Sequence, residues 1–228
     1  MAAGLLCSGA CETGAGAIIG GGAQGDPAGA RADPAPVPGG AGDVLGTKIL
    51  CDTAFDRTGS LRSDGAFVSM LTNKYVYAGD EGDTNLAQRA IISVVLNQIP
   101  AGANIVNATL RISGSAPEGD PFGEFGPMTV DHVNVVSSIS AVNFLGKTLT
   151  SSIATIPSLP YGVKQQQTLE LDVTAQIKAD LAAGRPISSF RFEFVNAPSV
   201  NGTFDQASLI ADQNDDNARP TVTVTTNP

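Results

Sequence analysis

Short stretches of alternating apolar and polar residues, separated by turn-forming residues, run from residue 46 to the end of the chain. Alternation with a period of two predicts strands that bury one face. The nearly continuous apolar run 89–96 instead predicts a strand buried on both faces. In all, the pattern predicts about ten strands, at 47–51, 66–71, 74–78, 89–96, 104–113, 128–136, 167–173, 189–195, 207–211 and 220–226.

One segment follows a helical pattern instead. Thr174 is a suitable N-cap, and Ile177 and Leu181 are spaced i and i+4. Gly184 followed by Pro186 predicts where this helix ends. About ten short strands with frequent turns and one short helix predict an all-β fold, an antiparallel β-sandwich over residues 46–228.

Residues 1–45, called the arm below, differ in composition from the rest of the chain. They contain 12 Gly, 11 Ala and 4 Pro, and no aromatic residue. Such a segment cannot bury enough side chain to offset the entropy of ordering it, which predicts a flexible Gly/Ala/Pro-rich arm or linker. Residues 1–11 are either a remnant of an export signal or part of the mature protein. The lack of a basic residue after Met1 and the short apolar stretch 2–6 favour the second interpretation.

One segment of the arm has the composition of a strand that adds to a neighbour. Small residues flank an Ile-Ile pair there, so the segment is suited to lie along an exposed sheet edge, where backbone hydrogen bonds supply most of the affinity. A plain linker is the alternative interpretation of the same composition. The residues of this predicted assembly segment are Ala15, Gly16, Ala17, Ile18, Ile19, Gly20 and Gly21.

Composition and charge exclude several classes of protein. The 228-residue chain carries 13 Lys and Arg against 22 Asp and Glu, a net charge of −9, whereas a nucleic-acid binder needs a basic surface. No apolar run approaches the roughly 18 residues of a membrane-spanning helix. A low content of charged residues (15%), together with many Thr, Ser and Val, is typical of an extracellular or cell-surface all-β protein.

Three sequence elements carry a resemblance to a known family. The first covers 88–112 and holds an Ile-Pro-Ala-Gly-Ala turn between two strands. The second is Leu-Glu-Leu-Asp-Val-Thr at 169–174, and the third is Ala-Arg-Pro-Thr-Val-Thr-Val at 218–224. Together they resemble DNRLRE domains, which are similar to carbohydrate-binding module family 96, over residues 46–228. The resemblance implies a secreted, non-catalytic, jelly-roll-like module of the kind often appended to surface or polysaccharide-active proteins.

Aromatic side chains that stack on sugar rings are scarce in this chain, which has no Trp and 3 Tyr. Tyr75 and Tyr77 share one face of their predicted strand and are the candidate sugar contacts, with Tyr161 as the third tyrosine. A partly buried strand pair is the competing interpretation of Tyr75 and Tyr77. The net negative charge also repels acidic polysaccharides, which weakens the prediction of carbohydrate binding.

Two acidic loops are candidates for calcium binding. Ca²⁺ takes six to eight oxygen ligands, which closely spaced carboxylates and backbone carbonyls can supply. Neither loop has the spacing of an EF-hand, and a solvated acidic turn is the alternative in each case. The candidate ligands are Asp80, Asp83, Asp212, Asp215 and Asp216. No other cofactor is predicted.

The chain has three cysteines, an odd number that leaves one thiol free, lipidated or paired between chains. Cys7 and Cys11 are close together in the arm, and Cys51 ends the first predicted strand. In an exported protein, an arm cysteine of one copy bonded to Cys51 of another would link an assembly. A Cys7–Cys11 bond with Cys51 buried as a small apolar side chain is the alternative.

No catalytic set is present in the sequence. The chain has no GxSxG, phosphate-loop or HExxH motif. His132, the one histidine, lies beside Asp131 in a predicted strand, and no motif marks a Ser or Cys nucleophile near it. A structural histidine is therefore predicted, and the protein is not expected to be an enzyme.

These observations lead to two hypotheses of function. The first is a non-catalytic secreted or surface structural protein that binds copies of itself, the arm of one copy packing on the sheet edge of the next. A head-to-tail contact of this kind does not close on itself and builds filaments. The alternative is a carbohydrate-binding module that recognises a polysaccharide.

Overall fold

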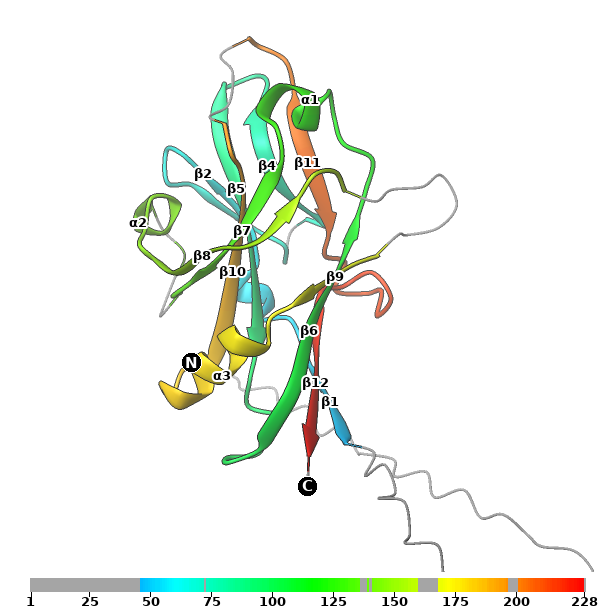
Figure 1. The fold of residues 1–228 in the computed structure, drawn as a ribbon. Coiled ribbons are helices and arrows are strands. Elements are labelled where there is room, and N and C mark those ends of the chain that lie inside the picture. Colours follow the sequence, from blue (N-terminus) through cyan, green and yellow to red (C-terminus); the bar gives the residue numbers. More distant parts are fainter. Residues whose placement is uncertain are drawn as a thin grey trace, which may run out of the picture. The chain divides into compact units, whose positions relative to one another are not determined.

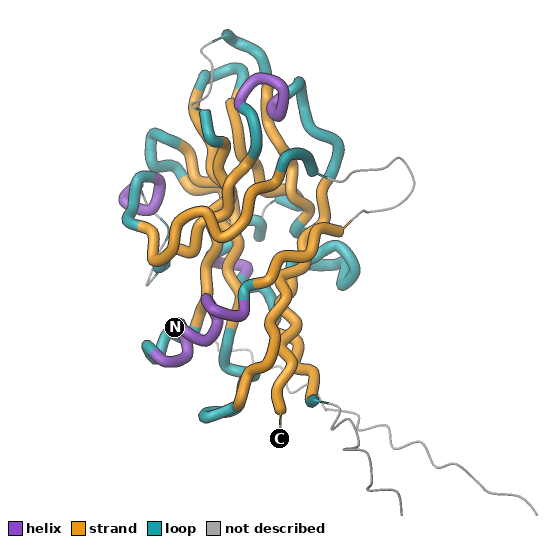
Figure 2. Tube along the Cα trace, in the orientation of Figure 1, coloured by secondary structure: helices purple, strands orange, loops and turns teal. Residues whose placement is uncertain are grey.

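The computed structural model of the protein describes residues 46–71, 73–135, 139, 141–159, 168–196 and 201–227. These residues form twelve antiparallel strands, with short helices around them (Figure 1, Figure 2). The predicted all-β antiparallel fold is confirmed. Residue Tyr161 and the whole arm lie outside the described residues.

The strands have the following bounds: β1 Thr47–Cys51, β2 Gly59–Arg62, β3 Phe67–Ser69, β4 Tyr75–Glu81, β5 Leu86–Val95, β6 Asn104–Gly114, β7 Met128–Val133, β8 Thr148–Ile156, β9 Thr168–Asp172, β10 Ile187–Phe194, β11 Asp205–Ile210 and β12 Thr221–Asn227. The helices are the 3-10 turn η1 Phe55–Arg57, α1 Pro121–Phe125, α2 Ala141–Phe144 and α3 Thr174–Ala182.

The strands form two groups joined by a short ladder. The first group, called the four-stranded part, has the order β1-β12-β6-β9. The second, called the six-stranded part, has the order β11-β4-β5-β10-β7-β8, and β2 and β3 continue from β5. Only two residue pairs, Leu209 with Gly114 and Ile210 with Ser113, join β11 to β6. The two parts are therefore held together mainly by their side chains.

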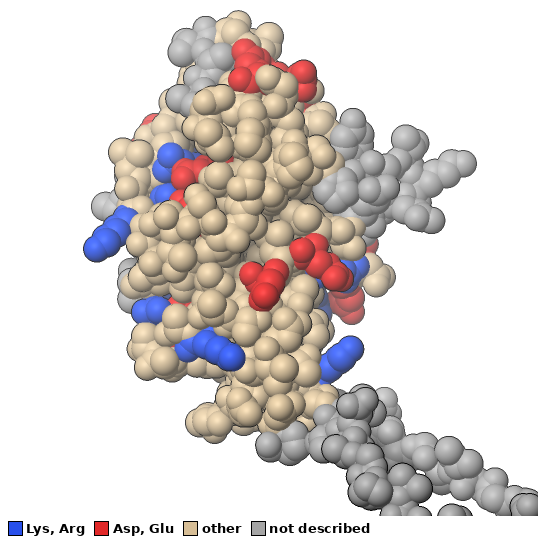
Figure 3. Space-filling model, viewed as in Figure 1, with Lys and Arg blue, Asp and Glu red and all other residues tan. Residues whose placement is uncertain are grey.

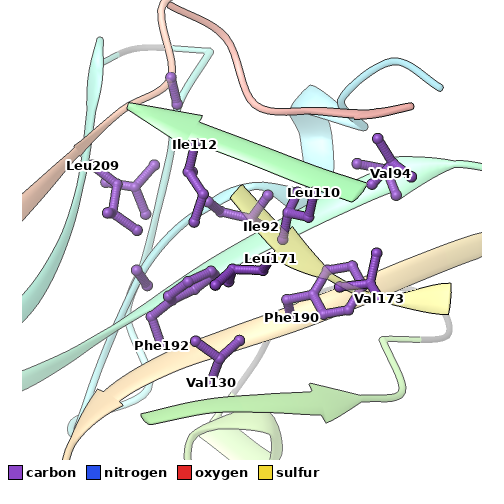
Figure 4. Close-up of a cluster of buried hydrophobic side chains, with 14 of the residues drawn as sticks. Ile92, Val94, Leu110, Ile112, Val130, Leu171, Val173, Phe190, Phe192 and Leu209 are labelled. Atoms are coloured by element: carbon purple, nitrogen blue, oxygen red, sulfur yellow. The ribbon is translucent and has the colours of Figure 1, made fainter. Parts of the chain in front are cut away.

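One apolar core lies between the two parts. Alternate residues of both parts enter it, because successive side chains of a strand point to opposite faces. Figure 4 shows Leu110 and Leu171 of the four-stranded part facing Phe190 and Phe192 of the six-stranded part, and all four belong to one buried cluster. Full burial of a side chain of this size contributes about 1.5 to 3 kcal/mol.

Strand β5 is buried on both faces, which confirms the prediction for the apolar run 89–96. Ile92 lies in the main core, whereas Ile91 packs on the other face in a smaller cluster with Leu61 and Phe144. Beside this smaller cluster, Arg191 of β10 is also buried. Its guanidinium donates to the Asp131 carboxylate at 2.7 Å and to the Phe144 carbonyl at 3.2 Å, so this charge is compensated within the protein.

The structure adds five elements that the sequence pattern does not predict, one of them the 3-10 turn η1. Helices α1 and α2 have five and four residues, too few to show a helical period. Strand β8 is rich in Thr and Ser, and its pairing with β7 shifts register twice, so apolar and polar residues do not alternate along it. Strand β2 lies in the segment 52–65 that its turn residues mark as a loop, yet Leu61 at its centre is fully buried.

Helix α3 lies close to its predicted position. Thr174 is its first residue rather than its N-cap, and the Asp172 carboxylate accepts a hydrogen bond from the Thr174 backbone N–H at 2.9 Å. Ile177 is fully buried, and Leu181 packs against the core from the same helix face. The helix ends before Gly184, whose φ of 67° favours glycine.

A buried hydrogen bond between His132 and Asp180 fixes α3 to the six-stranded part. His132 of β7 and Asp180 of α3 are each 1% exposed, and His132 Nε2 lies 2.9 Å from the Asp180 carboxylate. The Arg185 guanidinium donates to the other Asp180 oxygen at 2.5 Å. Burial raises the pKa of Asp180, but the hydrogen bonds from His132 and Arg185 outweigh it and hold that pKa below its ordinary value. His132 thus has a structural partner.

We expect Asp180→Asn to lower the free energy of unfolding by about 3 kcal/mol at pH 7, because it removes the buried carboxylate charge that faces His132 and the partly exposed Arg185 guanidinium. The lowered pKa means that the carboxylate contributes its full stability above about pH 4 and loses it as the pH falls through the native-state value. The difference between wild type and variant should therefore shrink in acid. Urea unfolding between pH 3 and pH 7 measures this. Glu170→Gln, at an exposed position of β9, is the control, and an equal loss in both variants would contradict the prediction.

Candidate functional site

A groove with one tyrosine and several amide and carboxyl side chains lies beside β4 and β11. It has a volume of about 360 Å³, and Tyr77, Gln88, Gln206, Glu118 and Phe204 are among its lining residues. Gln88 and Gln206 face Gly79 from the two strands that flank β4. The groove, called the tyrosine groove below, thus combines one aromatic ring with several hydrogen-bonding groups.

The two candidate tyrosines take different positions at this groove. Both lie on the outer face of β4, while Val76 and Ala78 between and after them face the core. Their ring centroids are 6.3 Å apart and the ring planes are inclined by 41°. Tyr77 lines the groove, and burial raises the pKa of its phenol, so the hydroxyl is neutral at ordinary pH. The 37% exposed Tyr75 lies beside it.

The polar side chains of the groove are only partly satisfied within the described residues. The Gln206 amide donates to the Glu118 carboxylate at 2.8 Å. The side-chain oxygens of Gln88 and Gln206 are buried and accept no hydrogen bond from the part of the chain that the structure describes. No sequence pattern predicts that these two glutamines lie together, because they belong to strands far apart along the chain.

A second group of polar residues lies where β4 and β11 meet α1. Asp80 is fully buried at the end of β4, and its register partner on β11 is Asp205. Glu124 of α1 lies beside Asp205, because the Asn201 side-chain amide donates to both carboxylates, at 3.2 Å and 3.3 Å. These three carboxylates, Asp80, Glu124 and Asp205, are called the acidic corner below. Asp205 and Glu124 are not among the residues that the acidic loops predict as cation ligands.

Of the other predicted calcium ligands, one is exposed and three already have an ion-pair or hydrogen-bond partner. Asp83 is exposed in the turn after β4, and Asp212 forms an ion pair with Lys74 at 3.0 Å. Asp215 accepts a backbone hydrogen bond from Asn217, and Asp216 pairs with Arg219 at 3.3 Å. Among the described residues, no group of three or more His, Cys, Asp or Glu side chains is placed so that it could hold a metal ion.

Cys51, the last residue of β1, is a free thiol within the main core. Burial, followed by the neighbouring charge of Asp52, raises the pKa of this thiol to about 11. A bond between Cys51 and another copy would require this end of β1 to open. Cys7 and Cys11 lie outside the described residues, as does the predicted assembly segment 15–21.

Several described strands leave one backbone edge unpaired, and β1 and β8 stand at the two ends of the strand order. The pairing of β1 with β12 is regular from Thr47 to Cys51. The pairing of β8 with β7 shifts register twice, and Ser152 has a φ of 51°. Bulges and irregular backbone hinder the addition of a further strand, so β1 is the more suitable edge.

Comparisons with known proteins identify no relative of this chain. No family model matches it, and neither does any curated protein. The resemblance to DNRLRE domains therefore stays a prediction. Within the described residues, no helix is sufficiently long and apolar to span a membrane.

We expect Cys51 to react with a thiol reagent such as DTNB about 100-fold more slowly in the native protein at pH 8 than after unfolding. The reason is its raised pKa, which leaves about 100-fold less of the reactive thiolate, together with its burial. Timed alkylation followed by peptide mass spectrometry measures Cys51 separately from Cys7 and Cys11. Equal rates for Cys51 in the native and unfolded chain would show that the end of β1 opens readily.

Proposed function

We propose that the protein is a non-catalytic structural protein, secreted or displayed at the cell surface, that assembles with copies of itself. The arm of one copy adds a strand to the β1 edge of the next copy. The observation that carries this proposal is the regular edge of β1 to which no described strand is paired. An edge of this kind is a template for backbone hydrogen bonding with another chain.

The side chains of β1 suit the Ile-Ile pair of the arm. Ile49 packs against the main core, whereas Leu50 lies on the other face and is 50% exposed. Ile18 and Ile19 also point to opposite faces when they are extended, because successive residues of a strand alternate. One isoleucine would then extend the core beside Ile49 and the other would cover Leu50. The glycines and alanines around the pair let the added backbone approach closely.

The length of the arm permits a contact between copies. Residues 22–46 separate the predicted assembly segment from β1, and an extended chain of this length spans up to about 80 Å. Donation from each copy to the next is a head-to-tail contact, which gives filaments when the rotation does not close into a ring. No charge need be buried at this edge, since Lys48, the one charged residue of β1, is exposed.

The jelly-roll-like arrangement implied by the DNRLRE resemblance belongs to this proposal. It is supported by the two facing groups of antiparallel strands and by the places of the three sequence elements. The first element forms β5, its turn and β6, the second forms β9 and the start of α3, and the third leads into β12. All three build the scaffold, which agrees with a protein whose role is architectural.

We expect deletion of residues 1–40 to leave a folded monomer, because residues 46–227 contain a buried core of their own. In the full chain, Ile19→Pro should abolish assembly, since proline lacks the backbone N–H that an added strand donates. Ala30→Pro, outside the assembly segment, is the matched control and should assemble like wild type. Light scattering after size exclusion and negative-stain microscopy measure the result. Unchanged assembly of the deletion variant would refute the proposal.

The tyrosine groove favours a second function, the binding of a neutral polysaccharide. Tyr77 offers an aromatic ring, while Gln88, Gln206 and Glu118 offer groups that hydrogen-bond to sugar hydroxyls. The carboxylates in and beside the groove, together with the net charge of −9, disfavour an acidic polysaccharide.

We expect Tyr77→Ala to weaken binding to a neutral polysaccharide at least about tenfold, the effect of losing about 1.4 kcal/mol of contact energy. Calorimetric titration against a panel of neutral polysaccharides measures the affinity. Val106→Ala, at a half-exposed position on β6, is the control and should bind like wild type. Binding that is equal in all three proteins, or absent from wild type, would exclude this groove as a sugar site. Assembly should be unaffected by Tyr77→Ala.

A further inference from the structure

Asp80 is a buried carboxylate that the protein leaves uncompensated. Its side chain is fully buried, and neither carboxylate oxygen accepts a hydrogen bond from the described residues. A polar group taken out of water without a hydrogen bond destabilises the folded state, and a charged group does so far more strongly. Something beyond the described side chains is therefore needed to stabilise Asp80.

The surroundings of Asp80 increase the negative charge instead of balancing it. Asp205 is its register partner, so both side chains point to the same side of the β4–β11 pair. Glu124 of α1 lies beside Asp205, since the Asn201 side-chain amide donates to both carboxylates. None of these three carboxylates takes part in an ion pair with a described Lys, Arg or His, although most other buried acids do. Figure 3 shows acidic side chains at the α1 end of the surface without a basic one beside them.

Asp205 and Asp80 differ in their hydrogen-bond donors and therefore in the direction of their pKa shifts. Asp205 accepts hydrogen bonds from the Asp120 backbone N–H at 2.9 Å and from the Thr203 hydroxyl at 2.7 Å. These donors hold the pKa of Asp205 below its ordinary value. Asp80 has no such donor, and burial together with the charges of Asp205 and Glu124 raises its pKa. The hydrogen bonds therefore favour the ionised form of Asp205. Its register partner Asp80 has no hydrogen-bond donor among the described residues.

The loop before α1 packs closely against Asp205 and Phe204. Gly119 has a φ of 67°, and a Cβ at this position would lie 2.2 Å from both an Asp205 carboxylate oxygen and the Phe204 carbonyl. Only glycine fits there. The backbone of this loop therefore lies directly against the Asp205 carboxylate and the Phe204 carbonyl.

We propose that the acidic corner binds one calcium ion, with Asp80 and Asp205 as carboxylate ligands and Glu124 adding negative charge. Backbone carbonyls and water complete the six to eight ligands that Ca²⁺ prefers.

A calcium ion at this position links three elements that are distant in sequence. Asp80 lies on β4, Asp205 begins β11, and Glu124 lies on α1. An ion bound to the folded state alone stabilises that state in proportion to the logarithm of its concentration. The full-length protein should therefore unfold at a higher temperature when calcium is present.

Thermal unfolding and equilibrium dialysis of the full chain test this site. The protein is first treated with EDTA and desalted, and CaCl₂, MgCl₂ or NaCl is then added at matched ionic strength. We expect one Ca²⁺ per chain and, at a concentration about 100 times Kd, a rise in Tm of about 5 to 10 °C. Asp80→Asn should bind Ca²⁺ at least tenfold more weakly and lose most of the rise in Tm. Asp83→Asn, at an exposed acid three residues later, should respond like wild type.

Three results would overturn the proposal. In the first, wild type takes up no Ca²⁺ in dialysis and shows no saturable rise in Tm, which would mean that Asp80 is stabilised by a proton. In the second, Asp80→Asn and Asp83→Asn bind Ca²⁺ equally. In the third, MgCl₂ and NaCl raise Tm as much as CaCl₂, which would indicate screening of charge. Circular dichroism of metal-free Asp80→Asn checks that the variant is folded, and dialysis measures its binding independently of stability.

Discussion

The apolar core shared by the four-stranded and six-stranded parts fixes how these two parts are aligned. The two parts are joined by a ladder of two residue pairs, so their alignment depends on side chains such as Leu110, Leu171 and Phe192. Each strand gives every second residue to this core. What remains for function is therefore restricted to the outer faces, the strand edges and the ends of the two parts.

Polar groups that enter the interior fall into two kinds. Arg191 with Asp131, and Asp180 with His132 and Arg185, are charges whose partners come from other elements of the fold. They fix α3 and the second face of β10. Asp80 differs, because the nearest charges around it have the same sign. Asp80 has no hydrogen-bond donor among the described residues, whereas Asp131 and Asp180 each have a partner. This contrast is the physical basis for proposing a cation at the acidic corner.

The proposed sites occupy different parts of the molecule. The β1 edge belongs to the four-stranded part, whereas the tyrosine groove lies on the outer face of the six-stranded part. The acidic corner lies at the end of the β4–β11 pair. A filament built through β1 would leave the groove accessible on every copy, so assembly and polysaccharide binding are compatible in one protein. Calcium at the corner would strengthen the strand pair that carries the groove.

Strands with a clear apolar–polar pattern could be predicted from the amino-acid sequence alone. The alternation along β6 and β12, the apolar run of β5 and the capped helix α3 were predictable because each depends on residues near one another in the chain. The position of Tyr75 and Tyr77 on one face of β4 followed from the same periodicity. Strands β2 and β8 and helices α1 and α2 were missed, since their residues carry no such period.

Contacts between residues that are distant in sequence could be identified only from the folded structure. The sequence paired Asp80 with Asp83 because they share a loop, whereas the fold faces Asp80 with Asp205, which is 125 positions later. It likewise placed Gln88 and Gln206 around one groove and left β1 at an edge. Periodicity states which way a side chain points, but the register between strands is fixed by the packing of the whole core. The candidate sites depend on that register, and so they became visible only in the folded chain.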